Sequence, residues 1–234
     1  MARLIAALIR HGDYYQLPDT PSAHQPFPLN VEGAAQAEGA AGILREVMAA
    51  HSWTLDPVID SSRMLRAWQT ARIIAQKMAG LFPVEASVES FDELAERGLG
   101  SAANLTVAQI RDIVQRDPRF PDPPEDWKSN SGYQLPLQGA ESLLQAGERV
   151  AAHLIRRMKA LAETSRRDVL KLFVGHGAAF RHAAFHLGVL EFEQISQFSM
   201  YHGRPVFLEY LADTQWHHIE GEWKIRNSRS HFLD

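Results

Sequence analysis

Short apolar runs of strand length alternate along the chain with longer segments in which apolar residues recur at helical spacing. The apolar runs lie at residues 4–9, 57–60, 84–88, 169–174 and 206–211, and each predicts a strand. Residues 216–225 also predict strands, with a hairpin turn at Gly221. Helical spacing occupies residues 31–50, 63–79, 106–116, 141–161 and 178–187. Strands that alternate with helices predict an α/β fold in three layers, with a mostly parallel central sheet covered by helices on both faces.

Residues that cap or interrupt helices divide the chain further. Asn30 precedes the first helical segment and the pair Ser61–Ser62 precedes the second, so each is a candidate helix cap. Beyond residue 98 the periodicity weakens, and four prolines between Pro118 and Pro124 exclude regular structure there. We therefore expect one domain over residues 1–234 that carries an insertion at about 98–140, placed as a cap over another part of the molecule.

The composition excludes several classes of site. The chain has 234 residues, of which 45% are hydrophobic and 22% charged, as in ordinary globular domains. It has no cysteine, which excludes disulfides, thiolate zinc sites, iron–sulfur clusters and a cysteine nucleophile. A net charge of −4 gives no general attraction to nucleic acid or to anionic membranes. Since no apolar run is long enough to span a bilayer and none ends in a secretory cleavage site, we expect a cytoplasmic protein without nucleic-acid or membrane partners.

Two histidines follow two of the predicted strands. His11 comes one residue after the run 4–9, and His176 comes one residue after the run 169–174. Each is followed by a glycine, Gly12 or Gly177, that lets backbone and ligand approach closely. Ligands of open α/β sheets bind beyond the carboxyl ends of the strands, so both imidazoles are expected to face one crevice.

Two arginines belong to the same expected crevice. Arg10 precedes the first histidine, and Arg66 lies near the start of the second helical segment. A guanidinium group is a planar cation that suits phosphate or carboxylate, and helix N-termini favour anions. The four side chains together predict an anion pocket.

Five sequence blocks in this order resemble the histidine phosphatase superfamily, which has the phosphoglycerate-mutase-like fold. The blocks are Leu8–Gly12, Ser61–Ala71, Leu94–Arg97 with Gly100, Gly139–Leu143 leading to Arg149, and Val174–Gly177 with Arg181. They extend from residue 4 to about residue 188, and the region beyond Leu190 adds little. Five ordered blocks are more specific than any one of them.

The resemblance implies a reaction through a covalent phosphohistidine. His11 would be the nucleophile, because a neutral imidazole is nucleophilic near pH 7. Arg10, Arg66 and His176 would hold the phosphoryl oxygens, and His176 would count as catalytic for that reason. No metal and no cofactor are implied.

The same resemblance assigns the proton transfers. Glu96 would protonate the leaving oxygen and then deprotonate the attacking water, with Glu93 as the alternative acid. Arg97 and Gly177 are candidates for contact with the substrate. The implied enzyme is a phosphomonoesterase of the histidine acid-phosphatase type that acts on a small phosphorylated substrate; a phosphoprotein substrate and an oligomeric state stay open.

Departures from the mutases of this family favour a phosphatase. Residues 13–17 contain no asparagine, Gly98–Leu99 replaces the mutase histidine and tyrosine, and Ala178–Ala179 replaces a polar pair. A cofactor-dependent phosphoglycerate mutase and a non-catalytic module that binds phosphorylated ligands are the alternatives.

The other histidines are not expected to bind metal. His217 and His218 are adjacent, so in a strand they point to opposite faces; together with His202 and His231 they are interpreted as strand or surface residues. His182 and His186 have the spacing of ligands on a helix, but no glutamate accompanies them in a metalloprotease pattern, which favours packing.

Overall fold

The central sheet of the computed structural model is mixed and mostly parallel. The structure describes residues 2–22, 24–211 and 215–226. The strands run in the order β4-β3-β5-β1-β7-β8, and β2 pairs with β5. Their bounds are β1 (Leu4–Arg10), β2 (Thr54–Leu55), β3 (Val58–Ser62), β4 (Ser87–Phe91), β5 (Val169–Gly175), β7 (Val206–Tyr210) and β8 (Trp216–Glu220). β1, β3, β4 and β5 are parallel, whereas β7 is antiparallel to both β1 and β8.

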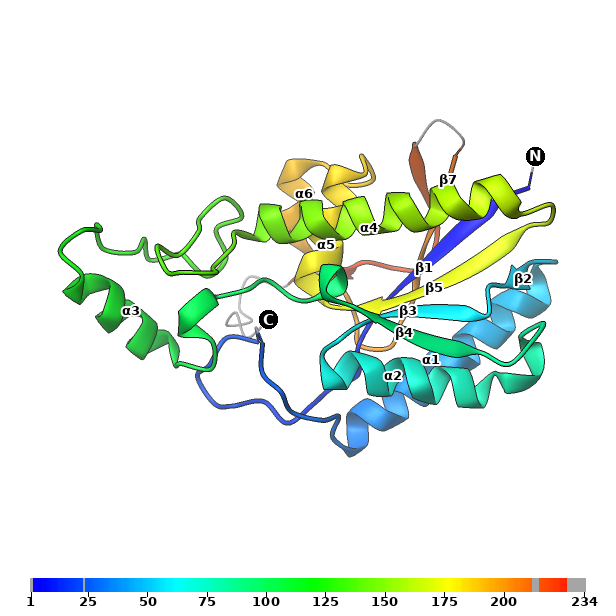
Figure 1. Cartoon of the computed structure of the whole chain (residues 1–234), viewed down its shortest axis with the longest axis horizontal. Coiled ribbons are helices and arrows are strands. Elements are labelled where there is room, and N and C mark those ends of the chain that lie inside the picture. Colours follow the sequence, from blue (N-terminus) through cyan, green and yellow to red (C-terminus); the bar gives the residue numbers. More distant parts are fainter. Residues whose placement is uncertain (1, 23, 212–214, 227–234) are drawn as a thin grey trace.

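Helices cover both faces of this sheet, which confirms the predicted three-layer architecture. On one face lie α1 (Val31–Ala50) and α2 (Leu65–Lys77), and on the other α4 (Leu143–Thr164) and α5 (Gly177–His186) (Figure 1). The remaining helices are α3 (Val107–Arg116) and α6 (Phe192–Gln197). Short 3-10 turns occupy Ala79–Leu81, Asp92–Leu94 and Gly100–Ala102, and a second, two-stranded sheet pairs β6 (Phe198–Ser199) with β9 (Lys224–Ile225).

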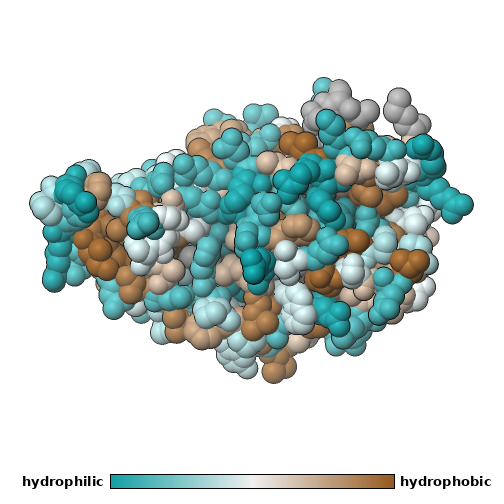
Figure 2. Space-filling model, viewed as in Figure 1, coloured by the Kyte–Doolittle hydropathy of each residue, from teal (hydrophilic) through white to brown (hydrophobic). Residues whose placement is uncertain are grey.

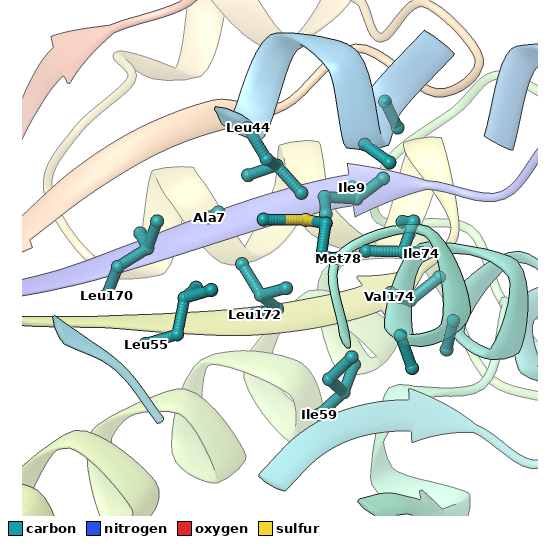
Figure 3. Packing of buried hydrophobic residues seen from close by; sticks show 14 of the residues in the cluster. Ala7, Ile9, Leu44, Leu55, Ile59, Ile74, Met78, Leu170, Leu172 and Val174 are labelled. Carbon is teal, nitrogen blue, oxygen red and sulfur yellow. The ribbon is translucent and has the colours of Figure 1, made fainter. Parts of the chain in front are cut away.

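The first strand shows why its sequence is a continuous apolar run. Ala7 and Ile9 pack with Leu44 of α1 and Ile74 of α2 (Figure 3). The alternate residues, such as Leu8, pack under α4 and α5. Because successive side chains of a strand point to opposite faces, a central strand between two helical layers must be apolar at every position.

Three local predictions were wrong. Gly221 does not join a hairpin, because β8 pairs with β7 while β9 pairs with β6. The third strand starts at Ser87 instead of residue 84, and Val84 is exposed. Ser61 and Ser62 end β3 and are buried, and the residue that precedes α2 is Met64, which makes no side-chain cap.

Residues 99–140 pack around a small apolar cluster of their own. Ile110 of α3, Trp127 and Leu135 are buried together in it. Helix α3 lies apart from the sheet (Figure 1) and begins with a capping box formed by Thr106 and Gln109. The division into one domain with a capping insertion stays a prediction.

Polar residues cover most of the face shown in Figure 2, and apolar residues gather beside α3. None of the helices in the described part of the chain is both long and apolar enough to cross a membrane.

The start of α1 touches the loop after β1 so closely that only glycine fits there. A Cβ on Gly33 would lie 1.8 Å from the backbone oxygen of Asp13, and a Cβ on Gly12 would lie 2.2 Å from the backbone oxygen of Gly33. Gly39, in the same helix, has no atom within 4 Å of such a Cβ.

We expect Gly33→Ala to lower the free energy of unfolding by about 1–3 kcal/mol, the usual cost of overpacking. Gly39→Ala is the matched control and should raise the free energy by about 0.5–1 kcal/mol, since alanine is the better helix former. Urea unfolding of both variants measures this difference. Equal effects at the two positions would contradict the close contact.

Candidate active site

The carboxyl ends of three neighbouring strands bring the predicted residues together. Arg10 at the end of β1 is in register with Gly175 at the end of β5, and the backbone N–H of His11 donates to the Gly175 carbonyl at 3.0 Å. The rings of His11 and His176 are therefore neighbours, with centroids 5.0 Å apart. The two imidazoles thus lie side by side, as the prediction of one crevice requires, but only His11 lines the pocket described below, and His176 is fully buried behind it.

Arg66 lies between the two imidazoles. From the first turn of α2 its Nε donates to Nε2 of His11 at 3.1 Å, and its Nη2 lies 3.3 Å from Nδ1 of His176. A further N–H donates to the Gln25 carbonyl at 2.8 Å, and the guanidinium carbon is 4.4 Å from the centre of the Tyr14 ring. The arginine is fully buried, so these contacts fix its orientation.

The hydrogen bonds of His11 define which ring nitrogen can act as a nucleophile. Its Nδ1 lies 2.7 Å from the Gly12 carbonyl oxygen, which can only accept, so Nδ1 carries the proton. Nε2 accepts from Arg66 and keeps its lone pair. By the same reasoning Nδ1 of His176 accepts from Arg66, and its Nε2 donates to the Ser62 hydroxyl at 3.0 Å.

Burial and neighbouring cations keep both imidazoles neutral. Desolvation, followed by the Arg66 cation, holds the pKa of His11 well below 6.5, and the same two causes act in the same order on the pKa of His176. A neutral imidazole, with one ring nitrogen unprotonated, is the nucleophilic form.

Arg10 and Gly177 form another wall of the site. Arg10 is buried and donates from Nη1 to the Met200 carbonyl at 3.0 Å. A Cβ on Gly177 would lie 3.0 Å from Cδ of Arg10, so a larger residue would push this arginine aside.

A small, narrow pocket opens beside these residues. Its lining residues are Arg10, His11, Ser22, Glu96, Gly177, Ala178, Arg181 and Ser199. Glu96 is thus the predicted acid that reaches the pocket, and its Oε1 accepts from the backbone N–H of Arg97 at 2.9 Å. Glu93, the alternative acid, instead pairs with Arg156 at 3.1 Å and does not line the pocket.

A second, wider pocket shares Ser22, Glu96, Ala178 and Arg181 with the first, so the two are parts of one cleft. Its charged lining residues are Glu96 together with Arg97, Lys128, Arg181 and Arg226. Arg97 is buried, which lowers its pKa, and its guanidinium stands 5.9 Å from the centre of the Trp127 ring. Lys128 comes from the expected insertion, so that segment contributes to the cleft.

Some site residues were missed or misinterpreted. His202 was interpreted as a strand or surface histidine, but its Nδ1 donates to the His11 carbonyl at 2.6 Å and its ring centroid is 5.5 Å from that of His11. Ser62 was interpreted as a helix cap, but its hydroxyl accepts from Nε2 of His176. The contacts of His202 with His11 and of Ser62 with His176 each join residues more than a hundred positions apart, and no local pattern in the sequence signals them.

The remaining histidines differ in their surroundings. His182 is buried, bonds to the Ala178 carbonyl and meets the Ser131 hydroxyl, which fits the packing role expected for it. His186 is exposed and meets the Leu144 carbonyl. His217 and His218 lie exposed in β8, and His231 lies outside the described residues. Among the residues that the structure describes, no three histidine, aspartate or glutamate side chains are grouped as metal ligands.

Comparison with known proteins identifies the family. The sequence profile of the histidine phosphatase superfamily (branch 1) matches residues 6–218, and the chain belongs to that superfamily. No curated protein matches the chain in sequence.

Solved structures confirm the fold. The mycobacterial glucosyl-3-phosphoglycerate phosphatase is similar with a TM-score of 0.64 and 20% identity, over 97% of this chain and 99% of that one. The alpha-ribazole phosphatase from Shigella flexneri is similar with a TM-score of 0.64 and 22% identity, over 96% of each chain.

Buried neutral histidines make the stability of the protein depend on pH. Burial, with help from Arg181, lowers the pKa of His182 to about 3, and the pKa values of His11 and His176 are lowered too. In the unfolded chain these groups titrate near 6.5. Their contribution is therefore complete above pH 6.5 and is lost as the pH falls, because the unfolded chain then binds protons that the folded protein does not.

We expect the free energy of unfolding to fall between pH 6.5 and pH 5, with about 1.4 kcal/mol per pH unit from each such histidine as an upper value. His182→Gln should reduce this slope by about 1 kcal/mol per pH unit. His217→Gln, which changes an exposed histidine, is the control. Urea unfolding at several pH values tests this, and an unchanged slope in His182→Gln would contradict it.

Proposed function

We propose that the protein is a phosphatase that hydrolyses a small phosphomonoester through a phosphohistidine on His11. The observation that carries this proposal is the lone pair on Nε2 of His11, held beside the buried guanidinium of Arg66 at 3.1 Å. A phosphoryl group on that nitrogen would bring its oxygens within reach of Arg66 and Arg10, and of His176 once Nδ1 of that ring carries a proton. Phosphoryl transfer depends on such positioning and charge stabilisation.

The first step forms a bond between phosphorus and Nε2 of His11 and breaks the bond between phosphorus and the leaving oxygen. Glu96 gives its carboxyl proton to that oxygen, so the leaving group departs as an alcohol. In the second step Glu96 takes a proton from water, whose oxygen attacks phosphorus. The phosphorus–nitrogen bond breaks, and inorganic phosphate leaves from a regenerated neutral His11.

The comparisons support a small phosphorylated substrate. Both neighbours reported above are named as phosphatases of small molecules. The mycobacterial enzyme has also been solved with inorganic phosphate and with VO3.

Removing the nucleophile gives the direct test. We expect His11→Ala to lower kcat/KM for para-nitrophenyl phosphate by about 10⁴-fold or more, the order of loss when a covalent nucleophile is removed. Phosphate release is the measurement, and His186→Ala, which changes an exposed histidine, is the control. Activity that survives His11→Ala would refute the nucleophile.

Two further measurements separate the alternatives. Interconversion of 3- and 2-phosphoglycerate with a bisphosphoglycerate primer would favour the mutase. Tight phosphate binding without turnover of any substrate would favour the non-catalytic module.

We propose further that Arg97 and Gly177 meet the substrate, with Arg97 facing the leaving group. Arg97 lines the wider pocket together with three other cationic side chains, and the only carboxylate among its lining residues is Glu96. Such a surface favours leaving groups that carry a negative charge.

We expect Arg97→Gln to raise KM about tenfold for a substrate with a carboxylate on its leaving group, such as 3-phosphoglycerate, since a charged hydrogen bond is worth about 1.5–3 kcal/mol. KM for glycerol phosphate, which lacks the carboxylate, should change little. Arg116→Gln removes an exposed arginine outside the pocket and is the control. An equal change in KM for both substrates would contradict a contact with the leaving group.

A further inference from the structure

We infer that Arg149 and Glu141 are positioning residues that brace the segment carrying Glu96, and that they act on the reaction through this acid. The inference rests on the role proposed for Glu96. Neither residue lines the cleft, and neither was assigned a role from the sequence.

Arg149 holds the backbone before the acid. Its Nη1 donates to three carbonyl oxygens of one turn: Asp92 at 3.2 Å, Glu93 at 2.7 Å and Ala95 at 3.2 Å. These carbonyls surround the 3-10 turn Asp92–Leu94, which ends one residue before Ala95 and two before Glu96. A lysine could not replace this arrangement, because Nε and Nη2 of the same guanidinium also bond to Glu141, and only a planar guanidinium offers separate donors in fixed directions.

Glu141 holds the backbone after the acid. Its Oε1 accepts from the backbone N–H of Gly98 at 2.9 Å, and the Gly98 carbonyl in turn accepts from the backbone N–H of Glu141 at 2.9 Å. The carboxylate also pairs with Nε and Nη2 of Arg149. One ion pair thus grips the chain on both sides of Glu96.

The brace is anchored to the sheet through α4. One turn beyond Arg149, His153 meets Oδ2 of Asp60 in β3 at 2.8 Å, and one turn further Arg157 meets the same oxygen at 2.8 Å. Asp60 and His153 are fully buried. The helix that carries Arg149 is therefore fixed to a strand next to β5, whose end carries His176, so the acid is held at a set distance from the histidines.

The consequence is specific to the leaving group. Misplacing a catalytic group by about 1 Å can cost on the order of 10²-fold in rate. A good leaving group departs without a proton, so a displaced acid slows only the transfer from esters with poor leaving groups. kcat/KM reports the steps up to that departure.

The test compares kcat/KM for phenyl phosphate, a poor leaving group, with kcat/KM for para-nitrophenyl phosphate, a good one. The ratio is kcat/KM for phenyl phosphate divided by kcat/KM for para-nitrophenyl phosphate. Measured on one preparation, it does not depend on the fraction of folded enzyme. We expect Arg149→Gln and Glu141→Gln to lower this ratio about 10–100-fold, and Glu96→Gln to lower it at least as much. The double variant Arg149→Gln with Glu96→Gln should have the same ratio as Glu96→Gln alone. Arg149 acts through Glu96, so its loss has no further effect on this ratio once the acid is gone.

Two further variants separate the brace from other effects. Arg149→Lys keeps the positive charge that lowers the pKa of His176, so it should lower the ratio as Arg149→Gln does if the hydrogen bonds matter. Arg63→Gln removes an exposed arginine that meets only the side chain of Asp92 in that turn, and it should leave the ratio unchanged.

Each outcome decides the inference. A lowered ratio in Glu96→Gln but not in Arg149→Gln would overturn the brace and leave the proposed function standing. An unchanged ratio in Glu96→Gln would overturn both. Equal losses for the two substrates in Arg149→Gln, or a further loss in the double variant, would mean that Arg149 acts on the fold or through another group.

Discussion

A buried cation between two neutral imidazoles is the interaction on which the site depends. Removing a guanidinium from water is costly, and the cost is offset only if its donors are met by well-placed acceptors. The hydrogen-bond partners described for Arg66 are His11, His176 and the carbonyls of Ser22 and Gln25, all neutral. Their dipoles orient the arginine, and the Glu96 carboxylate acts on its charge electrostatically. Under the proposed function, an arriving phosphoryl dianion would meet a cation that is already oriented.

The parallel strands hold the residues of this arrangement in place. β5 lies between β1 and β3, so the ends of three strands deliver His11, His176 and Ser62 side by side. The packing of both faces holds these strand ends in place, because interiors are close-packed and resist displacement. The hydrogen bonds that leave Nε2 of His11 unprotonated are therefore present without substrate.

The sequence predicted this central part well for a physical reason. An apolar run followed by a histidine and a glycine places the histidine at a strand end, and parallel strands end at the same edge. Local patterns of this kind also located α1 to α5 to within a few residues, but they missed the short helix α6. They failed at Gly221, where a glycine next to a strand suggested a hairpin, because the partner of β9 lies far away in sequence.

The parts of the site that the sequence did not predict are those made by long-range contacts. His202 bonds to the backbone of a residue 191 positions away, and Arg149 bonds to carbonyls about 55 positions away. A side chain that recognises a carbonyl oxygen leaves no trace in residue identity at the other end, since every residue has one. Charge patterns could not reveal these partners, whereas the resemblance to a family located Glu96 through its motif.

The wider pocket is built in part from different segments of the chain than the small pocket at the strand ends. Part of its wall comes from Pro21 and Ser22 in the loop after β1, from Lys128 and Ser129, and from Arg226 near the end of the described chain. None of these residues belongs to a strand of the main sheet. Under the proposed function, exchanging Pro21, Lys128, Ser129 or Arg226 would therefore change which alcohol is admitted while leaving the strand ends that carry His11 and His176 untouched.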